Sequence, residues 1–397
     1  MESTTKAILI FNLGSSSLKF AVYSAEAIDD IALLAGKIEN IGQAPQFFAK
    51  DTREGIAHGP RWQSIPKNIS HGDLSLKVLD WLANYESSFR ICAVGHRIVH
   101  GGQILNEPTI IDEKALRYIE ALIPLAPLHQ PKALEVIKAI YSKVPDLPQI
   151  GCFDTSFHRN LPKLARTFAN PHKLTEDGII RYGFHGLSYD YVASQLPEYL
   201  GAKASGRTII AHLGNGASLC AIKDGKSVAT TMGFTALDGL MMGERCGSLD
   251  PGIILHFIKS GNMTPDKIEH MLYRESGLRG VSGLSHNMSV LEASSDPRAQ
   301  EAIDLFCYRA VSTLGSLIGN LRGLDNLIFT AGIGENSPLV RKKICEALGW
   351  LGVEIDHARN ENNNHFISTD SSKVSLLVIP TNEEIIIAKN VRKLQKF

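Results

Sequence analysis

Short apolar runs alternate with longer amphipathic stretches along this chain of 397 residues. Residues 7–11 are apolar, residues 18–23 alternate apolar and polar side chains, and the small residues 14–17 lie between them. This pattern predicts two strands joined by a tight turn. Further periodic segments follow in chain order: helical over 74–86, extended over 91–99, and helical over 112–123 and 131–143. The alternation of strand and helix patterns predicts an α/β protein.

Residues 207–226 repeat the opening pattern. Leu213-Gly214 takes the place of Leu13-Gly14, and in both segments an apolar strand pattern, a turn of small residues and a second strand pattern follow one another. The repeat predicts an internal duplication, with two related α/β domains that face each other. A third glycine turn, at residues 332–334, lies between a strand pattern and a helix pattern, and the polar residues 359–365 predict a surface loop.

The charges balance, because 41 Lys and Arg residues are matched by 41 Asp and Glu residues. Nucleic-acid-binding proteins usually carry a basic excess and disordered chains few apolar residues, whereas 44% of this chain is apolar. No apolar stretch approaches the length of a membrane helix, and the N-terminus lacks the pattern of a secretory signal. The six cysteines form no C-x-x-C pair. We therefore expect a cytoplasmic protein with free thiols and with neither a nucleic acid nor a membrane as partner.

Three glycine-rich turns are candidates for phosphate binding, at residues 14–17, 214–216 and 332–334. Turns of this composition allow several backbone N–H groups to point inward, where they bind anions. Lys19 follows the first turn and offers a cation, and the last turn opens a helix whose N-terminus favours anions. A single turn of this kind is usually a plain hairpin, but three in one chain favour a phosphate ligand. The spacings match neither a P-loop nor a Rossmann motif.

Charged and imidazole side chains lie beside glycines and apolar runs in four segments, at residues 94–102, 152–158, 181–186 and 242–247. An arginine at a strand end can hold a carboxylate or a phosphate through two hydrogen bonds. His96 and His100 have the spacing of a metal pair, but the flanking glycines argue against the helix that such a pair needs. Taken alone, His185 fits a buried structural histidine better than a catalytic one.

Taken together, these motifs resemble the acetate kinases (acetokinases) and the closely similar propionate kinases. Residues 12–19 are similar to the first signature of that family and residues 210–225 to the second. The other matches follow in family order, at residues 95–102, 125–129, 153–155, 181–186, 330–336 and 380–384. The resemblance extends from about residue 7 to residue 390. It implies a duplicated actin/sugar-kinase/Hsp70-like (ribonuclease H-like) α/β fold, with ATP in a cleft between the domains.

The resemblance also implies domain boundaries, partners and cofactors. The first domain is expected to comprise residues 1–154, completed by a C-terminal helix at 384–397, and the second, nucleotide-binding domain residues 155–383. The family typically forms homodimers through the second domain, for which the apolar helix pattern at 298–321 offers a surface. The implied cofactor is Mg²⁺, with Mn²⁺ as an alternative, and the co-substrates are ATP and ADP.

The implied reaction is the reversible transfer of the ATP γ-phosphate to acetate, which gives acetyl phosphate and ADP. Asn12 and Glu383 would hold the metal, and Lys19 would contact an ATP phosphate. Arg97 would bind the substrate carboxylate, and Asp154 has the position that the family labels the catalytic acid or base. The phosphoryl group would be stabilised by His185 and Arg245, with His129 nearby. The acyl pocket is assigned to Val99, Leu128, Phe184 and Ala236. The nucleotide site is assigned to His212, Leu213, Gly214, Asn215, Gly216, Asn287, Met288, Ser289, Gly332, Ile333, Gly334, Glu335 and Asn336.

The residue types fit this chemistry. A carboxylate nucleophile is already ionised at neutral pH, so it needs positioning rather than deprotonation, and phosphoryl transfer depends mainly on positioning and charge neutralisation. We therefore expect Asp154 to orient Arg245 or His185, or to tune the metal, rather than to act as a general base.

Several positions depart from the family pattern. Residues 287–289 are Asn-Met-Ser where Asp-x-Arg is usual near the adenosine, which loosens the expected nucleotide preference. Glu244 replaces a usual Thr beside Arg245, and Ser248 replaces a usual Asp. Ala236 replaces a usual proline and favours some tolerance of propionate, although acetate stays the expected substrate. The nearest alternative is the same scaffold with another acceptor (propionate or butyrate) or another donor (GTP or pyrophosphate). A non-catalytic actin-like nucleotide switch is a distant alternative.

Overall fold

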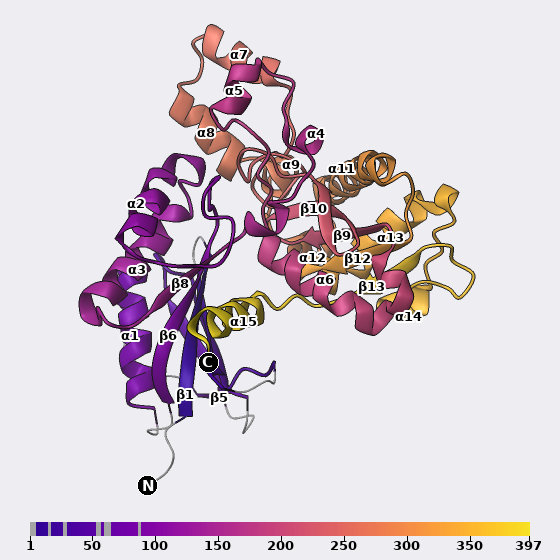
Figure 1. The fold of residues 1–397 in the computed structure, drawn as a ribbon. Helices are drawn as coiled ribbons and strands as arrows, with labels where there is room; N and C mark the ends of the chain where they lie inside the picture. The colour runs from indigo at the N-terminus through magenta and orange to yellow at the C-terminus, as the bar shows by residue number, and fades with distance from the viewer. Residues whose placement is uncertain (1–4, 15–16, 27–29, 53–56, 59–64, 86–88) are drawn as a thin grey trace. The chain divides into compact units, whose positions relative to one another are not determined.

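The computed structural model describes residues 5–14, 17–26, 30–52, 57–58, 65–85 and 89–397. The chain divides into two compact units (Figure 1). The first comprises residues 1–156 together with 382–397, and the second comprises residues 157–381. The chain therefore passes between the units twice, after Ser156 and after Thr381.

The first unit is built on an eight-stranded sheet with the order β5-β4-β3-β2-β1-β6-β8-β7. Its strands are β1 (Thr5–Leu13), β2 (Leu18–Ser24), β3 (Leu34–Glu39), β4 (Gln46–Asp51), β5 (Ala57–His58), β6 (Phe89–Ile98), β7 (Thr109–Ile110) and β8 (Gln149–Phe153). Strands β1 to β5 form an antiparallel meander. Strands β1, β6 and β8 are parallel, so their carboxyl ends meet at one edge of the sheet.

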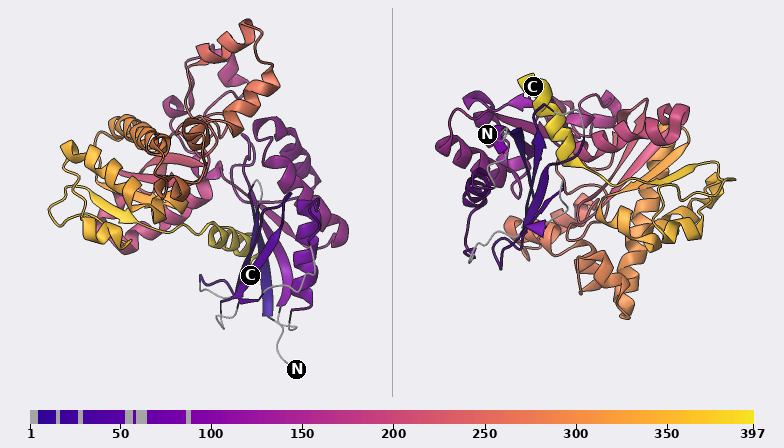
Figure 2. Two further views of the ribbon diagram at one scale, coloured as in Figure 1. Left: turned by 180° about the vertical axis from the view of Figure 1, so that it is seen from behind. Right: turned by 90° about the horizontal axis from the view of Figure 1, so that it is seen from below.

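Helices cover both faces of this sheet, and the side chains of β1 show how. Successive side chains of a strand point to opposite faces. Phe11 belongs to the apolar core that includes residues of α1 (His71–Ala83) and α3 (Gln130–Lys143). Ile10 points the other way, toward Ile387 of α15 (Glu383–Gln395), and both side chains pack over the backbone of Gly95. The C-terminal helix, yellow in Figure 2, thus lies against the first strands of the chain. Burial on both faces explains why β1 is a continuous apolar run.

The second unit contains a five-stranded sheet with the order β11-β10-β9-β12-β13. Its strands are β9 (Thr208–Leu213), β10 (Ala217–Lys223), β11 (Lys226–Thr230), β12 (Asn326–Thr330) and β13 (Ser375–Val378). Strands β9 to β11 form an antiparallel meander, and β9, β12 and β13 are parallel. The order matches β3-β2-β1-β6-β8 of the first unit, with a three-stranded meander followed by two parallel strands. The α/β class and the internal duplication are therefore confirmed.

Helices of the second unit pack on its sheet in a similar way. Tyr189 and Val192 of α6 (Gly186–Leu200) form a core with Ile210 and Ile328, and α11 (Pro297–Leu321) contacts β10 and β11. The remaining helices of the two units are α2 (Glu113–Ala121), α4 (Lys163–Arg166), α5 (His172–Glu176), α7 (Pro251–Lys259), α8 (Pro265–Arg274), α9 (Gly277–Ser282), α10 (Met288–Glu292), α12 (Ala331–Asn336), α13 (Pro338–Ala347) and α14 (His357–Glu361).

The prediction of a surface loop at residues 359–365 is wrong in its first part. Helix α14 extends to Glu361, and Asn360 is fully buried. The cause is Arg341, whose guanidinium is also fully buried and donates to Oδ1 of Asn360 at 2.7 Å and to its carbonyl oxygen at 2.8 Å. A buried guanidinium needs many acceptors, and this polar segment supplies them.

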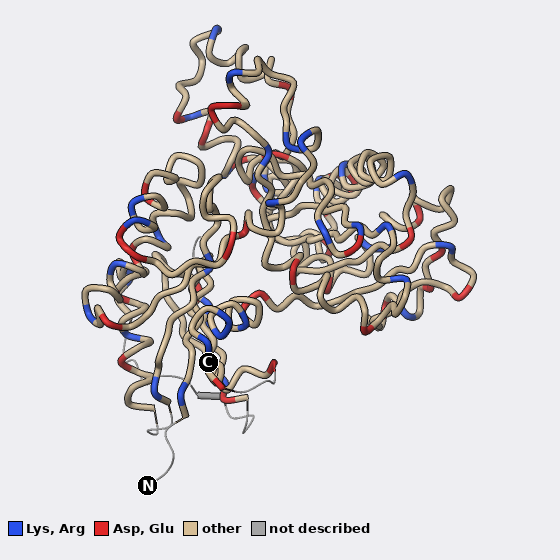
Figure 3. Tube along the Cα trace, in the orientation of Figure 1, with Lys and Arg blue, Asp and Glu red and all other residues tan. Residues whose placement is uncertain are grey.

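Basic and acidic residues are interspersed along both units, in keeping with the balanced net charge (Figure 3). Within the described ranges, no helix combines the length and the apolar character that crossing a bilayer requires.

Candidate active site

Polar side chains of the first unit gather where its parallel strands end. Asn12 is the last but one residue of β1, Arg97 the last but one of β6, and Asp154 directly follows β8. Ligands of open α/β sheets bind outside the carboxyl ends of the parallel strands. Three residues that are far apart in the sequence are therefore placed at one sheet edge by the strand order.

Arg97 and Asp154 form a bidentate pair. Nε of Arg97 donates to the two carboxylate oxygens of Asp154 at 3.0 and 3.1 Å, and Nη2 donates to Oδ2 at 2.7 Å. Burial raises the pKa of Asp154 above its ordinary value, and the guanidinium opposes that shift. Burial alone would lower the pKa of Arg97, but the charges of Asp154 and Glu383 raise it. Among the described residues, the side chain of Asp154 is hydrogen-bonded to Arg97.

The first turn of α15 brings two carboxylates to the same edge. Nδ2 of Asn12 donates to Glu383 at 3.0 Å and to Glu384 at 2.8 Å, and its Oδ1 accepts from Nη1 of Arg97 at 3.1 Å. Nε of Arg97 also lies 3.6 Å from Glu383. The helix begins here because Asn382 caps it, accepting the N–H of Ile385 at 3.1 Å. The sequence reading assigned Glu383 but not Glu384, although the two acidic residues are adjacent.

This cluster fits a divalent cation. When ionised, the three carboxylates of Asp154, Glu383 and Glu384 outweigh the single positive charge of Arg97, so the cluster carries an excess of negative charge. No group of three or more His, Cys, Asp or Glu side chains in the described ranges is arranged to enclose a metal ion. Mg²⁺ does not need such a cage, since it keeps several waters and usually takes one or two carboxylates together with substrate phosphates. Asn12 and Glu383, with Glu384 beside them, have the oxygen atoms that Mg²⁺ prefers.

In the second unit, two of the predicted phosphate turns are neighbours. The turn between β9 and β10 is closed by the N–H of Gly214, which donates to the carbonyl of Gly216 at 3.1 Å. A Cβ atom built on Gly214 would lie 3.6 Å from Cβ of Ala331 and 3.9 Å from the backbone nitrogen of Gly332. The turn therefore lies against the start of α12, at the carboxyl ends of the parallel strands β9 and β12.

Two side-chain nitrogen atoms converge on Gly216. A Cβ atom built there would lie 2.7 Å from Nη2 of Arg245 and 3.2 Å from Nε2 of His185. A side chain at this position would require the guanidinium of Arg245 to shift. Nη1 of Arg245 donates to the carbonyl of Ala236. The backbone beside Arg245 is tied to the same turn, because the N–H of Gly243 donates to the carbonyl of Asn215 at 3.0 Å.

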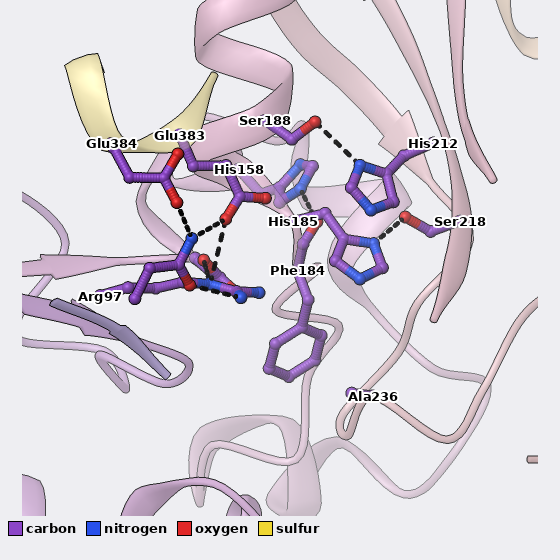
Figure 4. Close-up of polar contacts among 12 residues, drawn as sticks. Arg97, His158, Phe184, His185, Ser188, His212, Ser218, Ala236, Glu383 and Glu384 are labelled. Carbon is purple, nitrogen blue, oxygen red and sulfur yellow. Dashed lines mark hydrogen bonds and ion pairs between the residues drawn. The ribbon is translucent and has the colours of Figure 1, made fainter. Parts of the chain in front are cut away.

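His185 is held by its backbone and by its Nδ1 atom (Figure 4). It occupies the N-cap position of α6 with a left-handed φ of 59°, an uncommon conformation that is often found at functional sites. Its Nδ1 is 2.8 Å from Oγ of Ser218, and its ring stacks on that of His212 with 4.1 Å between centroids. Nδ1 of His212 is in turn 2.8 Å from Oγ of Ser188. The sequence analysis did not assign Ser188 or Ser218 to the site.

Oε1 of Glu335 accepts backbone hydrogen bonds and does not point outward from the segment at residues 332–336. That atom accepts the N–H of Ala331 at 2.8 Å and the N–H of Thr381 at 3.0 Å. Ala331 has a left-handed φ of 65°, so the carboxylate holds a turn that an alanine rarely adopts. The nearby amide of Asn336 donates to the carbonyl of Gly332 at 2.9 Å. The side chain of Glu335 therefore stabilises the backbone conformation of this segment.

The loop at residues 287–289 is engaged in helix capping. Oδ1 of Asn287 accepts from the N–H of Ser289 at 3.0 Å and from its hydroxyl at 2.9 Å, at the start of α10. Met288 is buried in the core. The side chain of Asn287 thus does what an Asp would do at an N-cap.

The other departures from the family pattern also find partners. Glu244 pairs with Arg279 at 2.8 Å and with Arg274 at 3.7 Å. The hydroxyl of Ser248 donates to Asp238 at 2.8 Å. These contacts show where the two substituted side chains are held, beside the segment that carries Arg245.

The remaining predicted residues are placed as follows. Lys19 is exposed on β2, opposite Asn12 in the strand register, and residues 15 and 16 of the turn before it lie outside the described ranges. His129 is at the N-cap position of α3 and is half-buried. Val99 and Phe184 are buried, and Leu128 and Ala236 are half-buried.

Comparisons with known proteins point to one family. The model of the acetokinase family matches residues 7–389. An acetate kinase of Rhodopseudomonas palustris is 47% identical over 98% of this chain and 98% of the relative, and one of Rickettsia felis is 46% identical over 97% and 98%. A propionate kinase of Francisella tularensis has a TM-score of 0.88 and 37% identity, covering 97% of this chain and 98% of its own. The acetate kinase of Porphyromonas gingivalis has a TM-score of 0.85 and 31% identity, covering 98% and 100%. The duplicated actin-like fold that the sequence predicted is the fold of these neighbours. This chain belongs to the acetokinase family.

Proposed function

We propose that the chain is a carboxylate kinase that reversibly transfers the γ-phosphate of ATP to acetate, giving acetyl phosphate and ADP. The observation that carries the proposal is the pair of side-chain nitrogen atoms, Nη2 of Arg245 and Nε2 of His185, that converge beside the glycine turn at Gly216. Full-length likeness to proteins named acetate kinase supports the choice of acetate. A passive nucleotide switch has no need for the side-chain nitrogens of Arg245 and His185 beside this turn.

The first unit would bind the acceptor. Arg97 is held from one side by Asp154 and from the other by Oδ1 of Asn12, so its guanidinium has few orientations to lose when a carboxylate binds. Asp154 is engaged in the pair with Arg97, which suits a positioning role. Since the acceptor carboxylate is already ionised, no base is required.

The second unit would bind the nucleotide and stabilise the transferring group. The turn at Gly214 and the start of α12 supply backbone N–H groups for phosphates. Negative charge on the equatorial oxygens of the phosphoryl group would meet Nη2 of Arg245 and Nε2 of His185. Pre-aligned donors of this kind are worth about 10²–10³ in rate each.

Mg²⁺ belongs to this proposal, with Asn12 and Glu383 as its protein ligands and Glu384 beside them. When bound, the metal would supply positive charge to offset that of the nucleotide phosphates. The excess negative charge of the cluster around Arg97 supports this assignment. Mn²⁺ would fit the same oxygen donors.

Propionate is the second candidate acceptor. Ala236 is small where the family usually has proline, and a propionate kinase is among the solved structures that resemble this chain. One methylene in an apolar pocket changes discrimination by about 1–3 kcal/mol, so both acids are expected to react, acetate faster.

Acyl-phosphate trapping with hydroxylamine tests the proposal. Acetate, propionate and butyrate are each compared with ATP, GTP and pyrophosphate as donor, and kcat/KM is measured for every pair. The proposal requires the highest value for acetate with ATP. A higher value for propionate or for another donor would reassign the substrate, and ATP hydrolysis without a trapped acyl phosphate would refute the kinase.

We also propose that the enzyme works as a cytoplasmic homodimer formed through the second unit. All six cysteines are free thiols, as is usual in a reducing compartment. Helix α7 exposes Ile253, Leu255 and Ile258, and α11 exposes Tyr308, which supports an apolar interface in this unit. Light scattering coupled to size-exclusion chromatography should give twice the mass of one chain, and a monomer at micromolar concentration would contradict the dimer.

A further inference from the structure

Two serine–histidine hydrogen bonds join the start of α6 to the hairpin of β9 and β10. His185 and Ser188 lie in the first turn of the helix, and His212 and Ser218 are register partners on the two strands. Nδ1 of His185 meets Ser218, and Nδ1 of His212 meets Ser188, each at 2.8 Å (Figure 4). Both imidazoles are thereby fixed through Nδ1.

Tyr189, which follows Ser188 on α6, determines which atoms of the hydrogen bonds at Ser218 carry the protons. Its hydroxyl is 2.5 Å from Oγ of Ser218, the one polar side-chain atom that it contacts in the described part of the chain. Burial raises the pKa of Tyr189 well above its ordinary value, so the phenol keeps its proton. A buried O–H needs an acceptor, and Oγ of Ser218 is the acceptor at hand.

The tautomer of His185 follows from counting the hydrogens at Tyr189 and Ser218. If Tyr189 donates to Oγ of Ser218, then the single hydrogen of Ser218 is free to donate to Nδ1 of His185. A neutral imidazole that accepts at Nδ1 carries its hydrogen at Nε2. That Nε2 atom is the one beside Gly216 and Arg245.

We propose that Ser218, oriented by Tyr189, is a positioning residue that keeps neutral His185 in the tautomer protonated at Nε2, so that this N–H donates to the transferring phosphoryl group. The inference rests on the proposed function and deepens it. The opposite tautomer would present a lone pair to an anion, and repulsion would replace a hydrogen bond. Without Ser218, the population of the tautomer protonated at Nδ1 should increase, because the neighbouring N–H groups of Arg245 favour an acceptor at Nε2.

The chain offers a matched control in His158. Its Nδ1 is 2.8 Å from Oγ of Ser227, a pair as short and as buried as that of His185 and Ser218. Nε2 of His158, however, faces the carbonyl oxygen of Phe184 at 3.0 Å, which requires a hydrogen at Nε2 with or without the serine. Ser227→Ala therefore removes a buried Ser–His bond without changing a tautomer.

Two-bond ¹H–¹⁵N correlation spectra of the protein labelled at histidine read the tautomer directly, with the signals of His185 assigned by their loss in His185→Gln. We expect hydrogen at Nε2 in the wild type and a growing share of hydrogen at Nδ1 in Ser218→Ala and in Tyr189→Phe. Hydrogen at Nδ1 of His185 in the wild type would overturn the proposal. If Ser218→Ala does not fold, Tyr189→Phe still tests the tautomer of His185, because it keeps the serine in place.

Kinetics separate positioning from structural support. Ser218→Ala should lower kcat about ten-fold, the worth of one hydrogen bond, with the KM for ATP nearly unchanged. Ser218→Thr, which keeps the hydroxyl, should restore kcat, and Ser227→Ala should not lower it. Equal losses of kcat in Ser218→Ala and Ser227→Ala would overturn the proposal. A wild type with Nε2–H at His185 but no acyl-phosphate product would instead refute the proposed function and leave the tautomer assignment standing.

Discussion

Replacing Asp154 by asparagine isolates what this carboxylate does. The side chain is 1% exposed and has three contacts with Arg97 of 2.7–3.1 Å. An asparagine of the same shape has one oxygen to accept these donors, and its amide hydrogens face the guanidinium. Arg97 keeps Asn12 at 3.1 Å and Glu383 at 3.6 Å as partners, so it is expected to rotate toward them and away from the acceptor.

The size of the effect follows from the number of bonds lost. Each hydrogen bond between charged groups contributes about 1.5–3 kcal/mol, and Asp154→Asn removes at least one. At 1.36 kcal/mol for each factor of ten, the loss amounts to about 10- to 150-fold in kcat/KM for acetate. Because Arg97 would bind the acceptor, we expect the loss to appear mainly as a higher KM for acetate.

Initial rates at varied acetate and varied ATP, from pH 5 to 9, give the needed constants. The KM for ATP and the shape of the pH profile should stay as in the wild type. Asp325→Asn is the matched control, because Asp325 forms a similar bidentate pair with Arg207, with contacts of 2.9 and 2.5 Å, in a different part of the chain. It should leave both KM values unchanged.

Two results would refute this reasoning. If Asp154→Asn lowers kcat at unchanged KM for acetate and removes the acid limb of the pH profile, then Asp154 transfers a proton. If all constants stay within two-fold of the wild type, the pair with Arg97 has no role in turnover.

Four further predictions test other parts of the site. Gly216→Ala should lower kcat about a hundred-fold, because its Cβ would come within 2.7 Å of Nη2 of Arg245; normal turnover would show that the donors do not converge there. Glu335→Ala leaves two backbone N–H groups without their carboxylate, so it should lower the unfolding free energy by about 1–3 kcal/mol for each and raise the KM for ATP; a wild-type melting temperature would contradict this. Glu383→Gln should raise the Mg²⁺ concentration needed for half-maximal activity, and an unchanged Mg²⁺ dependence would remove Glu383 from the metal site. Burial lowers the pKa of His96 from 6.5 to about 4, so the unfolded state binds more protons in that range and stability should fall by up to about 3 kcal/mol between pH 6.5 and 4. His96→Gln should flatten this dependence in urea titrations, and an equal slope in both proteins would contradict it.

Much of the fold could be predicted because alternation of side chains is a local property. The two glycine hairpins, the strand at 89–98 and the long helix at 297–321 lie close to where the pattern placed them. Boundaries were less accurate where a cap decides them. The helix predicted at 74–86 begins at His71, because Ser70 accepts the N–H of Asp73 at 2.9 Å.

The sequence indicated candidate site residues, but not the partners that the structure gives them. The pairing of Asp154 with Arg97 depends on β6 and β8 being neighbours, and the role of Glu384 depends on α15 returning to the first unit. Ser218 could have been found from the hairpin alone, since a turn at residues 214–216 places it opposite His212. The burial of Asn360 could not, because it follows from the distant Arg341.

Phosphorus NMR of the purified protein with ATP, Mg²⁺ and acetate tests the central claim most directly. The account predicts a new acyl-phosphate resonance that grows together with ADP, and it predicts ATP formation when acetyl phosphate and ADP are supplied instead. Inorganic phosphate as the sole product, or no change in the ATP signals over hours, would contradict the assignment of this site to carboxylate phosphorylation.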